Sequence, residues 1–393
     1  PPRASGTRRA RGDSGRSGCP GNEPPRCGGD RRGRHANDRQ RAESERSGEG
    51  PRKAETGREE AGPDGRRRLR RRLLRCEEVT EVSALRGVGL GFRGALAEEF
   101  LAAFPESMPA LSFVEVHPEN VMRRGGLQAR QFAAVAERWP VLSHGLSLSL
   151  GGDTFNADYL TTLRAFLMER RVPWHTDHLC FVGDGGHATH ELLPVPRSEE
   201  SVAHIVARIR EAQERLEIPL AVENVTFYAE TEEDRLTEGE FVTAICEEAD
   251  CGLLLDVNNI YVNAMNFGED PAARLATLPL HRTKHIHVAG HLVVPELRAP
   301  AGGPLRLDTH AEALDPRMVD LLEAALRRVG PVPVLLEHDD EFPPLAELYE
   351  TVKQLANVVA RATGEGARPF ATASKFAGGG VARDGGPTST GAL

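Results

Sequence analysis

Aromatic residues are scarce in this chain of 393 residues: Phe, Trp and Tyr together make up 5% of it. Long apolar runs are also missing, and no stretch approaches the roughly 20 residues that a membrane-spanning helix needs. The six cysteines show no CxxC motif and no paired spacing, which argues against a disulfide framework. These absences predict a cytoplasmic protein that has no membrane partner.

Charge is distributed unevenly along the chain. Residues 1–75 hold 22 basic against 11 acidic residues, which leaves 27 against 47 in residues 76–393, a net charge of −20 for that part. The first 80 residues are rich in Arg, Gly, Ser and Glu and lack the apolar residues needed to offset the entropy of ordering. We therefore expect a disordered extension over 1–80, a folded domain over 81–365 and a disordered tail over 366–393. The acidic balance of the domain argues against a nucleic-acid partner.

The folded part alternates short apolar runs with longer segments of helical periodicity. The runs are LRGVGLGF (85–92), LSFVEVH (111–117), VLSHGLSLS (141–149), VPWHTDHL (172–179), PLAVENV (219–225), GLLLDVNN (252–259), KHIHVAG (284–290) and PVPVLLEHD (331–339). The segments between them place apolar residues at i, i+3, i+4 and i+7, and several open on Asn, Ser, Thr or Asp. The last helical segment, LAELYETVKQLANVVARA, would close the series.

Eight strands alternating with helices in about 280 residues predict an α/β fold of the (β/α)8 TIM-barrel type. The rival is a doubly wound open sheet, which normally carries a Gly-rich fingerprint after its first strand. GVGLGF (87–92) resembles that fingerprint only superficially, and no acidic residue stands at the right distance to bind a ribose. The barrel is therefore preferred.

Polar residues stand late in these runs, so in a closed barrel they would meet at the carboxyl-end face, where TIM barrels place their active sites. Imidazoles and carboxylates brought together need a cation, and such ligands without thiolate suit iron, manganese or zinc. The number of ligands predicts two or three ions. For Glu115 and Asp339 a structural ion pair is the alternative interpretation, and His204 is expected on an outer helix.

The motifs GVGLGFR, FVEVHPENVM, SHGLSLSLGG, TDHLCF, AVENVTFY, LLLDVNNIYVNA, IHVAGH, DTH and LLEHDDEFP occur in this order between about Arg86 and Gln354. Together they resemble the multinuclear non-haem iron-dependent oxidative enzymes (MNIO), which are xylose-isomerase-like TIM barrels related to the methanobactin-biosynthesis oxidase. DVNNIYVNA, and HVAGH followed by DTH, are the most specific of these motifs.

The resemblance implies oxidative modification of a ribosomally made peptide, usually at cysteine, in natural product biosynthesis. It implies two or three irons in mixed Fe(II)/Fe(III) states, dioxygen as co-substrate, and a small partner protein that presents the precursor peptide. The metal ligands that it implies are His117, His144, Asp177, His178, Glu223, Asp256, Asn259, His287, His291, Asp308, His310 and Glu337. Glu223, as a bridging carboxylate, and Asp308 are expected to take part in catalysis.

The strand that contains His287 raises a specific expectation. Gly290 would let the chain turn without a side-chain clash, so that His291 can lean back over the same site as His287. Two other classes of function stay open: a metal-dependent isomerase or endonuclease-like phosphodiesterase on the same barrel, and a non-catalytic protein that binds peptide or metal.

Overall fold

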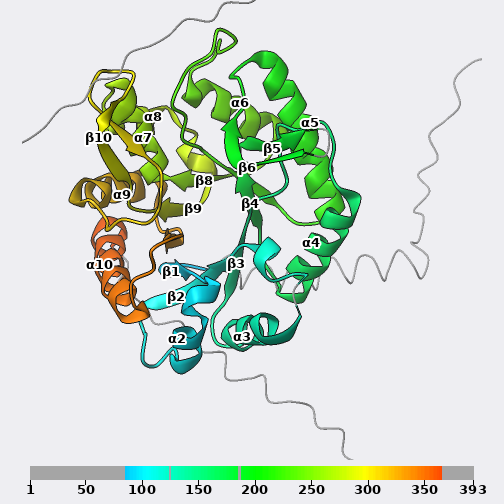
Figure 1. Cartoon of the computed structure of the whole chain (residues 1–393), viewed down its shortest axis with the longest axis vertical. Helices are drawn as coiled ribbons and strands as arrows, with labels where there is room; N and C mark the ends of the chain where they lie inside the picture. The colour runs from blue at the N-terminus through cyan, green and yellow to red at the C-terminus, as the bar shows by residue number, and fades with distance from the viewer. Residues whose placement is uncertain (1–84, 124, 185–186, 365–393) are drawn as a thin grey trace, which may run out of the picture. The chain divides into compact units, whose positions relative to one another are not determined.

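The structure, a computed structural model, describes residues 85–123, 125–184 and 187–364 (Figure 1). The extensions predicted over 1–80 and 366–393 lie outside these residues. Eight parallel strands close into a barrel in the order β1-β12-β9-β8-β7-β4-β3-β2. They are β1 (Val88–Gly91), β2 (Leu111–Val116), β3 (Val141–Gly145), β4 (His175–His178), β7 (Leu220–Glu223), β8 (Gly252–Asp256), β9 (Thr283–Val288) and β12 (Val334–Leu336). The predicted TIM barrel is confirmed.

Helices surround the barrel, as Figure 1 shows. They are α2 (Ala97–Ala102), α3 (Gly126–Ala136), α4 (Ala157–Glu169), α5 (Glu199–Leu216), α6 (Glu238–Ala249), α7 (Val257–Phe267), α8 (Pro271–Thr277), α9 (Pro316–Val329) and α10 (Leu345–Thr363), with short 3-10 turns at Gly94–Leu96, Pro118–Asn120 and Leu280–Arg282. No helix within the described ranges is long and apolar enough to cross a membrane.

The strand formed by the apolar run 252–259 is shorter than the run itself. Strand β8 ends at Asp256, and helix α7 begins at Val257. The cause is local, because the Asp256 carboxylate accepts a hydrogen bond from the backbone N–H of Asn259 at 2.6 Å and so caps the helix. Asn258 and Asn259 therefore lie in the first helical turn, directly above the barrel.

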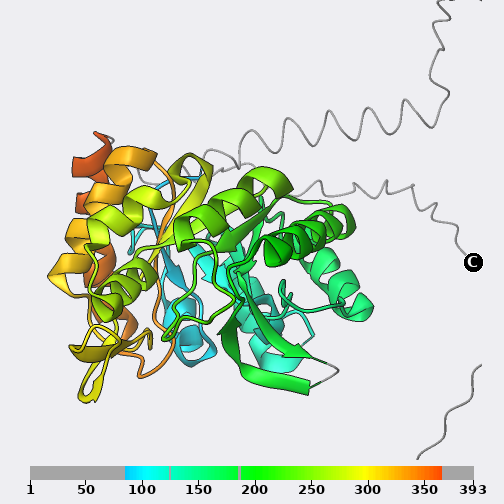
Figure 2. The same ribbon diagram turned by 90° about the horizontal axis from the view of Figure 1, so that it is seen from above.

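Two hairpins follow barrel strands and were not predicted. Strands β5 (Cys180–Asp184) and β6 (His187–Pro194) follow β4, and β10 (Leu292–Arg298) and β11 (Pro304–Leu307) follow β9. Because both leave the carboxyl end of a barrel strand, they project from the same face of the barrel (Figure 2). They flank the face on which the polar residues meet.

The barrel strands separate two apolar clusters. Outward residues such as Ile286 and Val288 belong to the large core shared with the helices. The smaller cluster, which we call the barrel plug, consists of Leu85, Phe113, Leu142, Trp174 and Leu335. In β9 the residues that alternate with Ile286 and Val288 are His285 and His287, so the period of two along the strand turns both imidazoles into the barrel.

Candidate metal centre

Most of the predicted ligands gather at the carboxyl end of the barrel. Each follows an apolar stretch that fixes the strand in the sheet, so the last one or two residues of that strand reach the barrel mouth. The structure places at this end His117, His144, His178, Glu223, Asp256, Asn259, His287 and Glu337, joined by Asp308 and His310 from the loop after β11.

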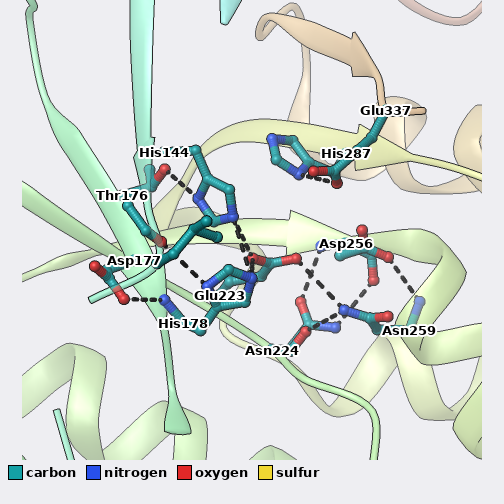
Figure 3. A network of polar contacts seen from close by, with 12 residues as sticks. His144, Thr176, Asp177, His178, Glu223, Asn224, Asp256, Asn259, His287 and Glu337 are labelled. Atoms are coloured by element: carbon teal, nitrogen blue, oxygen red, sulfur yellow. Dashed lines mark hydrogen bonds and ion pairs between the residues drawn. The ribbon is translucent and has the colours of Figure 1, made fainter. Parts of the chain in front are cut away.

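Glu223 lies at the centre of the first group, between two imidazoles and an amide (Figure 3). Its Oε2 lies 3.1 Å from Nε2 of His144 and 3.3 Å from Nε2 of His178. The Nδ2 of Asn259 donates to Oε1 at 3.4 Å. Glu223 is buried, yet Oε2 has no hydrogen-bond partner among the described residues. Atoms that bind one ion at about 2.1 Å lie about 3 Å apart, so this spacing fits a shared cation.

Glu337 joins a second group. Its Oε2 lies 2.9 Å from Nδ1 of His287 and 3.5 Å from Nδ1 of His310. Glu337, His310 and Asp256 each offer a ligand atom within 4.8 Å of the others. The Nε2 of His310 also lies 2.6 Å from Oδ1 of Asp308. Oδ2 of Asp256 and Nδ1 of His287 lack hydrogen-bond partners in the described part of the chain, as expected of atoms that face an ion.

A third group contains His117, Glu337 and Asp339, again with ligand atoms within 4.8 Å of one another. Nδ1 of His117 contacts the carbonyl oxygen of His144 at 2.9 Å, which leaves Nε2 directed to the site. Arg93 donates through Nε to Oδ1 of Asp339 at 2.9 Å, and its Nη2 lies 3.4 Å from Oε1 of Glu337. Asp339 is thus the partner of an arginine and a neighbour of two imidazoles.

The electrostatics of the cluster favour a bound cation. Burial raises the pKa of Glu223 well above its usual value, and the nearby Asp256 adds to this effect. Burial, with the charge of Asp308, raises the pKa of Asp256 to about 7. Burial lowers the pKa of His178 to about 4, and burial followed by the neighbouring imidazoles lowers that of His144. A metal ion would hold such carboxylates ionised and would use the neutral imidazoles as ligands.

Two predicted ligands lie apart from these groups. Asp177 lies on the far side of His178 from Glu223 (Figure 3) and accepts hydrogen bonds from the backbone N–H groups of Leu148, at 3.1 Å, and His178, at 2.8 Å. His291 packs on the ring of Tyr261 and contacts Oδ1 of Asn258 through Nδ1 at 3.0 Å. Asn258 in turn donates to Asp308 at 2.6 Å, so His291 reaches the cluster through Asn258.

Two residues that the sequence analysis did not select as ligands lie beneath the cluster. Glu115 and His285 are fully buried, and their side chains meet at 3.1 Å. Glu115 also contacts His287 at 3.0 Å, so it touches both histidines of strand β9. The signal for these two unselected residues was their position two residues before His117 and His287, on the same inward face of their strands.

A cavity of about 170 Å³ opens onto the cluster. Its polar wall is formed by His117, His178, Glu223, Asn259, Asp308, His310, Glu337 and Asp339, and its apolar wall by Leu146, Leu192 and Val225. The volume is that of one or two side chains. A polymeric ligand would therefore insert a single residue from an extended segment.

Comparison with known proteins places this site in a family. Residues 87–360 match the family described as RiPP precursor modification enzyme MbnB/TglH/ChrH. A UPF0276 protein of Neisseria meningitidis serogroup C is 43% identical over 278 residues, covering 70% of this chain and 95% of the relative. One from Shewanella amazonensis is 42% identical over 284 residues, covering 72% and 96%.

Among solved structures, a xylose isomerase-like TIM barrel protein from Mycobacterium smegmatis in complex with magnesium is 12% identical, with a TM-score of 0.47. It covers 71% of this chain and 98% of its own. The match over residues 87–360 and the relatives more than 40% identical confirm the family indicated by the sequence motifs.

Proposed function

Because the chain belongs to the MbnB/TglH/ChrH family of RiPP precursor modification enzymes, we propose that it oxidises a cysteine of a ribosomally made precursor peptide, using two or three irons and dioxygen. The observation that supports this most directly is Glu223, a buried carboxylate with an unpartnered oxygen at about 3 Å from two imidazoles. Glu223 shares one possible ligand group with His144 and His287, and the neighbouring groups that contain Glu337 suit more than one ion.

The donor set fits iron. It consists of imidazoles and carboxylates without a thiolate from the protein, a combination that iron, manganese and zinc accept. Glu223, His144 and His178 would hold one ion, Asp256, His287, His310 and Glu337 a second, and His117 with Asp339 would contribute to a third. Bound iron would supply the redox chemistry with dioxygen that no side chain of the cluster provides.

The residues that line the cavity would bind the substrate side chain and accept its proton. Leu146, Leu192 and Val225 would surround the entering side chain and exclude water. Asp308 lies on the cavity wall, where it could take the proton of an incoming cysteine thiol. Its orientation is fixed by the Asn258 amide at 2.6 Å and by the Thr226 hydroxyl at 3.4 Å. A thiolate formed there is the ligand form of cysteine.

A small partner protein that presents the precursor peptide belongs to the same proposal. The cavity accepts one or two side chains and has no room for a folded peptide, so the peptide must be delivered in extended form. The Leu192 side chain at its rim is 40% exposed, as is suitable for contact with a delivered segment.

The proposal is tested by metal analysis and by turnover. Anaerobically purified full-length chain should contain roughly two to three irons, an estimate from the ligand count. On exposure to dioxygen it should change the mass of a short cysteine-containing peptide encoded beside its gene. Glu223→Gln keeps the shape of the side chain and should lose both properties. The proposal would be contradicted if the chain kept no iron after being loaded with it, or if Glu223→Gln were fully active.

A further inference from the structure

Beneath the proposed metal centre, three buried side chains form a connected set: Glu115, Trp174 and His285. We propose that this set is a positioning device that makes His287 present Nδ1, and not Nε2, to the metal. The inference rests on the proposed metal centre and assigns no catalytic step to the three residues. It concerns which nitrogen of His287 is free to bind.

The set lies between two layers of the barrel interior. Trp174 belongs to the apolar barrel plug, whereas His287 belongs to the ligand groups at the mouth. Glu115 and His285 stand between them and are 0% exposed, as is His287. Polar groups buried to this degree are normally retained only with their hydrogen bonds satisfied, so their partners determine where the protons lie.

Trp174 fixes the tautomer of His285. The indole N–H can only donate, and it lies 3.2 Å from Nδ1 of His285. Nδ1 must therefore accept, which places the single proton of the neutral ring on Nε2. That Nε2 lies 3.1 Å from Oε2 of Glu115 and donates to it. His285 consequently has no free lone pair for a metal, although it lies close to the Glu115 carboxylate and the His287 imidazole.

Glu115 then orients His287. With Oε2 occupied by His285, its Oε1 remains, and it lies 3.0 Å from Nε2 of His287. Neither this Oε1 nor Nδ1 of His287 has another hydrogen-bond partner among the described residues. An N–H on Nε2 would satisfy Glu115 and leave Nδ1, 2.9 Å from Oε2 of Glu337, with a lone pair toward the ligand groups. A carboxylate that holds the second nitrogen is the usual support of a metal-binding histidine.

The competing arrangement is a further ion held by Glu115, His285 and His287, whose ligand atoms lie within 4.8 Å of one another. The proton on Nε2 of His285 opposes it, because that nitrogen lies 3.2 Å from Nε2 of His287 and would point its hydrogen into such a site. Removing His285 leaves only two ligands there, which is fewer than a bound metal needs.

Zn²⁺, which has no unpaired electrons, is the probe for the first experiment. In Glu115→Gln, the amide oxygen would still accept from His285, so the NH₂ group would face Nε2 of His287. That nitrogen would then have to accept, and the His287 proton would move to Nδ1. We expect the Zn²⁺ affinity of the full-length chain to fall about 10- to 100-fold. Trp174→Phe, which keeps an aromatic ring but removes the N–H, should lower it in the same direction.

His175→Gln is the matched control. His175 is also a fully buried histidine on a barrel strand, but its Nδ1 contacts Ser143 at 3.1 Å and it belongs to none of the ligand groups. This variant should keep wild-type Zn²⁺ affinity. Thermal unfolding of the metal-free proteins separates a loss of positioning from a loss of fold. Unchanged affinity in both Glu115→Gln and Trp174→Phe would overturn the inference.

Nitrogen NMR of ¹⁵N-histidine-labelled chain gives a readout that a merely structural role would not move. In the Zn²⁺ form, His287 should carry its proton on Nε2 and bind through Nδ1. Coordination through Nε2 would overturn the inference. In the metal-free form, His285 should carry its proton on Nε2. A proton on Nδ1 of His285 would by itself refute the proposed positioning by Trp174 and Glu115. A wild-type chain that binds no Zn²⁺ or iron would instead refute the proposed metal centre, so the two failures are distinguishable.

Discussion

At the scale of single residues, the barrel mouth contains carboxylates and imidazoles whose pKa values are far from ordinary. Burial opposes a charge on His287, but the carboxylates of Glu115 and Glu337 outweigh it and raise its pKa well above the usual value. Glu223 and Asp256 are shifted toward the protonated form by burial. Without a cation the cluster must keep protons where a metal would bind, so metal binding and proton release are coupled.

The first prediction at this scale concerns histidines. His287→Ala and His291→Ala should each lower iron content or abolish oxidation of a cysteine peptide, whereas His204→Ala should do neither. His287 lies in contact with Glu337, and His291 orients Asn258, which donates to Asp308. His204 contacts the Gly152 carbonyl oxygen from helix α5 instead. Iron analysis and peptide mass spectrometry on the three variants decide the matter. Full iron and activity in both the His287 and the His291 variant would remove these histidines from the site.

The second prediction follows from Asp256. Its pKa of about 7 means that below neutral pH a metal must displace a proton from this carboxylate, whereas above it the ligand is already ionised. Zn²⁺ affinity should therefore fall as the pH is lowered from about 8 to about 6. Asp256→Asn should bind more weakly at the higher pH and lose less affinity over the interval. Calorimetric titration at both pH values measures the two slopes, and equal slopes would be the contrary result.

At the scale of elements, the order of strands and helices was predictable because each strand is a short apolar run and each helix has a clear period of 3.6. The end of β8 was not, since the cap formed by Asp256 is a single hydrogen bond inside a continuous run. The hairpin of β10 and β11 was missed because β10 is mostly exposed and has no clean alternation of apolar and polar residues. The ligand groups were largely predictable from strand ends, whereas the roles of His285 and Arg93 depend on contacts across the barrel.

Gly290 gives a prediction for the loop after β9. Gly290 was expected to let the chain turn without a side-chain clash, and its φ is not positive, so no left-handed backbone conformation requires glycine there. Instead, a Cβ at this position would collide with the backbone carbonyl of Glu312. Gly290→Ala should therefore displace the segment that follows His310 and cost about 1–3 kcal/mol of stability, as overpacking usually does, with loss of metal.

Gly303→Ala is the matched control, because a Cβ there meets nothing within 4 Å. Thermal unfolding and iron analysis should show the wild-type result for this variant. The idea of a close backbone approach would be rejected if Gly290→Ala resembled Gly303→Ala in both measurements.

At the scale of the whole molecule, the family match over residues 87–360 and the closed barrel coincide. The barrel closes by the pairing of β1 with β12, beginning at Val88 with Val334. Leu85, 4% exposed, is the earliest described residue and completes the barrel plug. Among the described residues, the first contributions to the plug and to barrel closure therefore come from Leu85 and Val88.

This boundary predicts the outcome of two truncations. Deletion of residues 1–78 should leave folding and metal content intact, because that segment lacks a core-forming pattern and Leu85 is retained. Deletion of residues 1–88 should fail, because it removes Leu85 from the plug and Val88 from the strand pair that closes the barrel. Loss of a buried leucine side chain alone costs about 2–5 kcal/mol. Soluble yield, thermal unfolding and iron analysis compare the two chains with the full-length protein. If the shorter deletion already abolished soluble, metal-loaded protein, residues 1–78 would have to be part of the working structure.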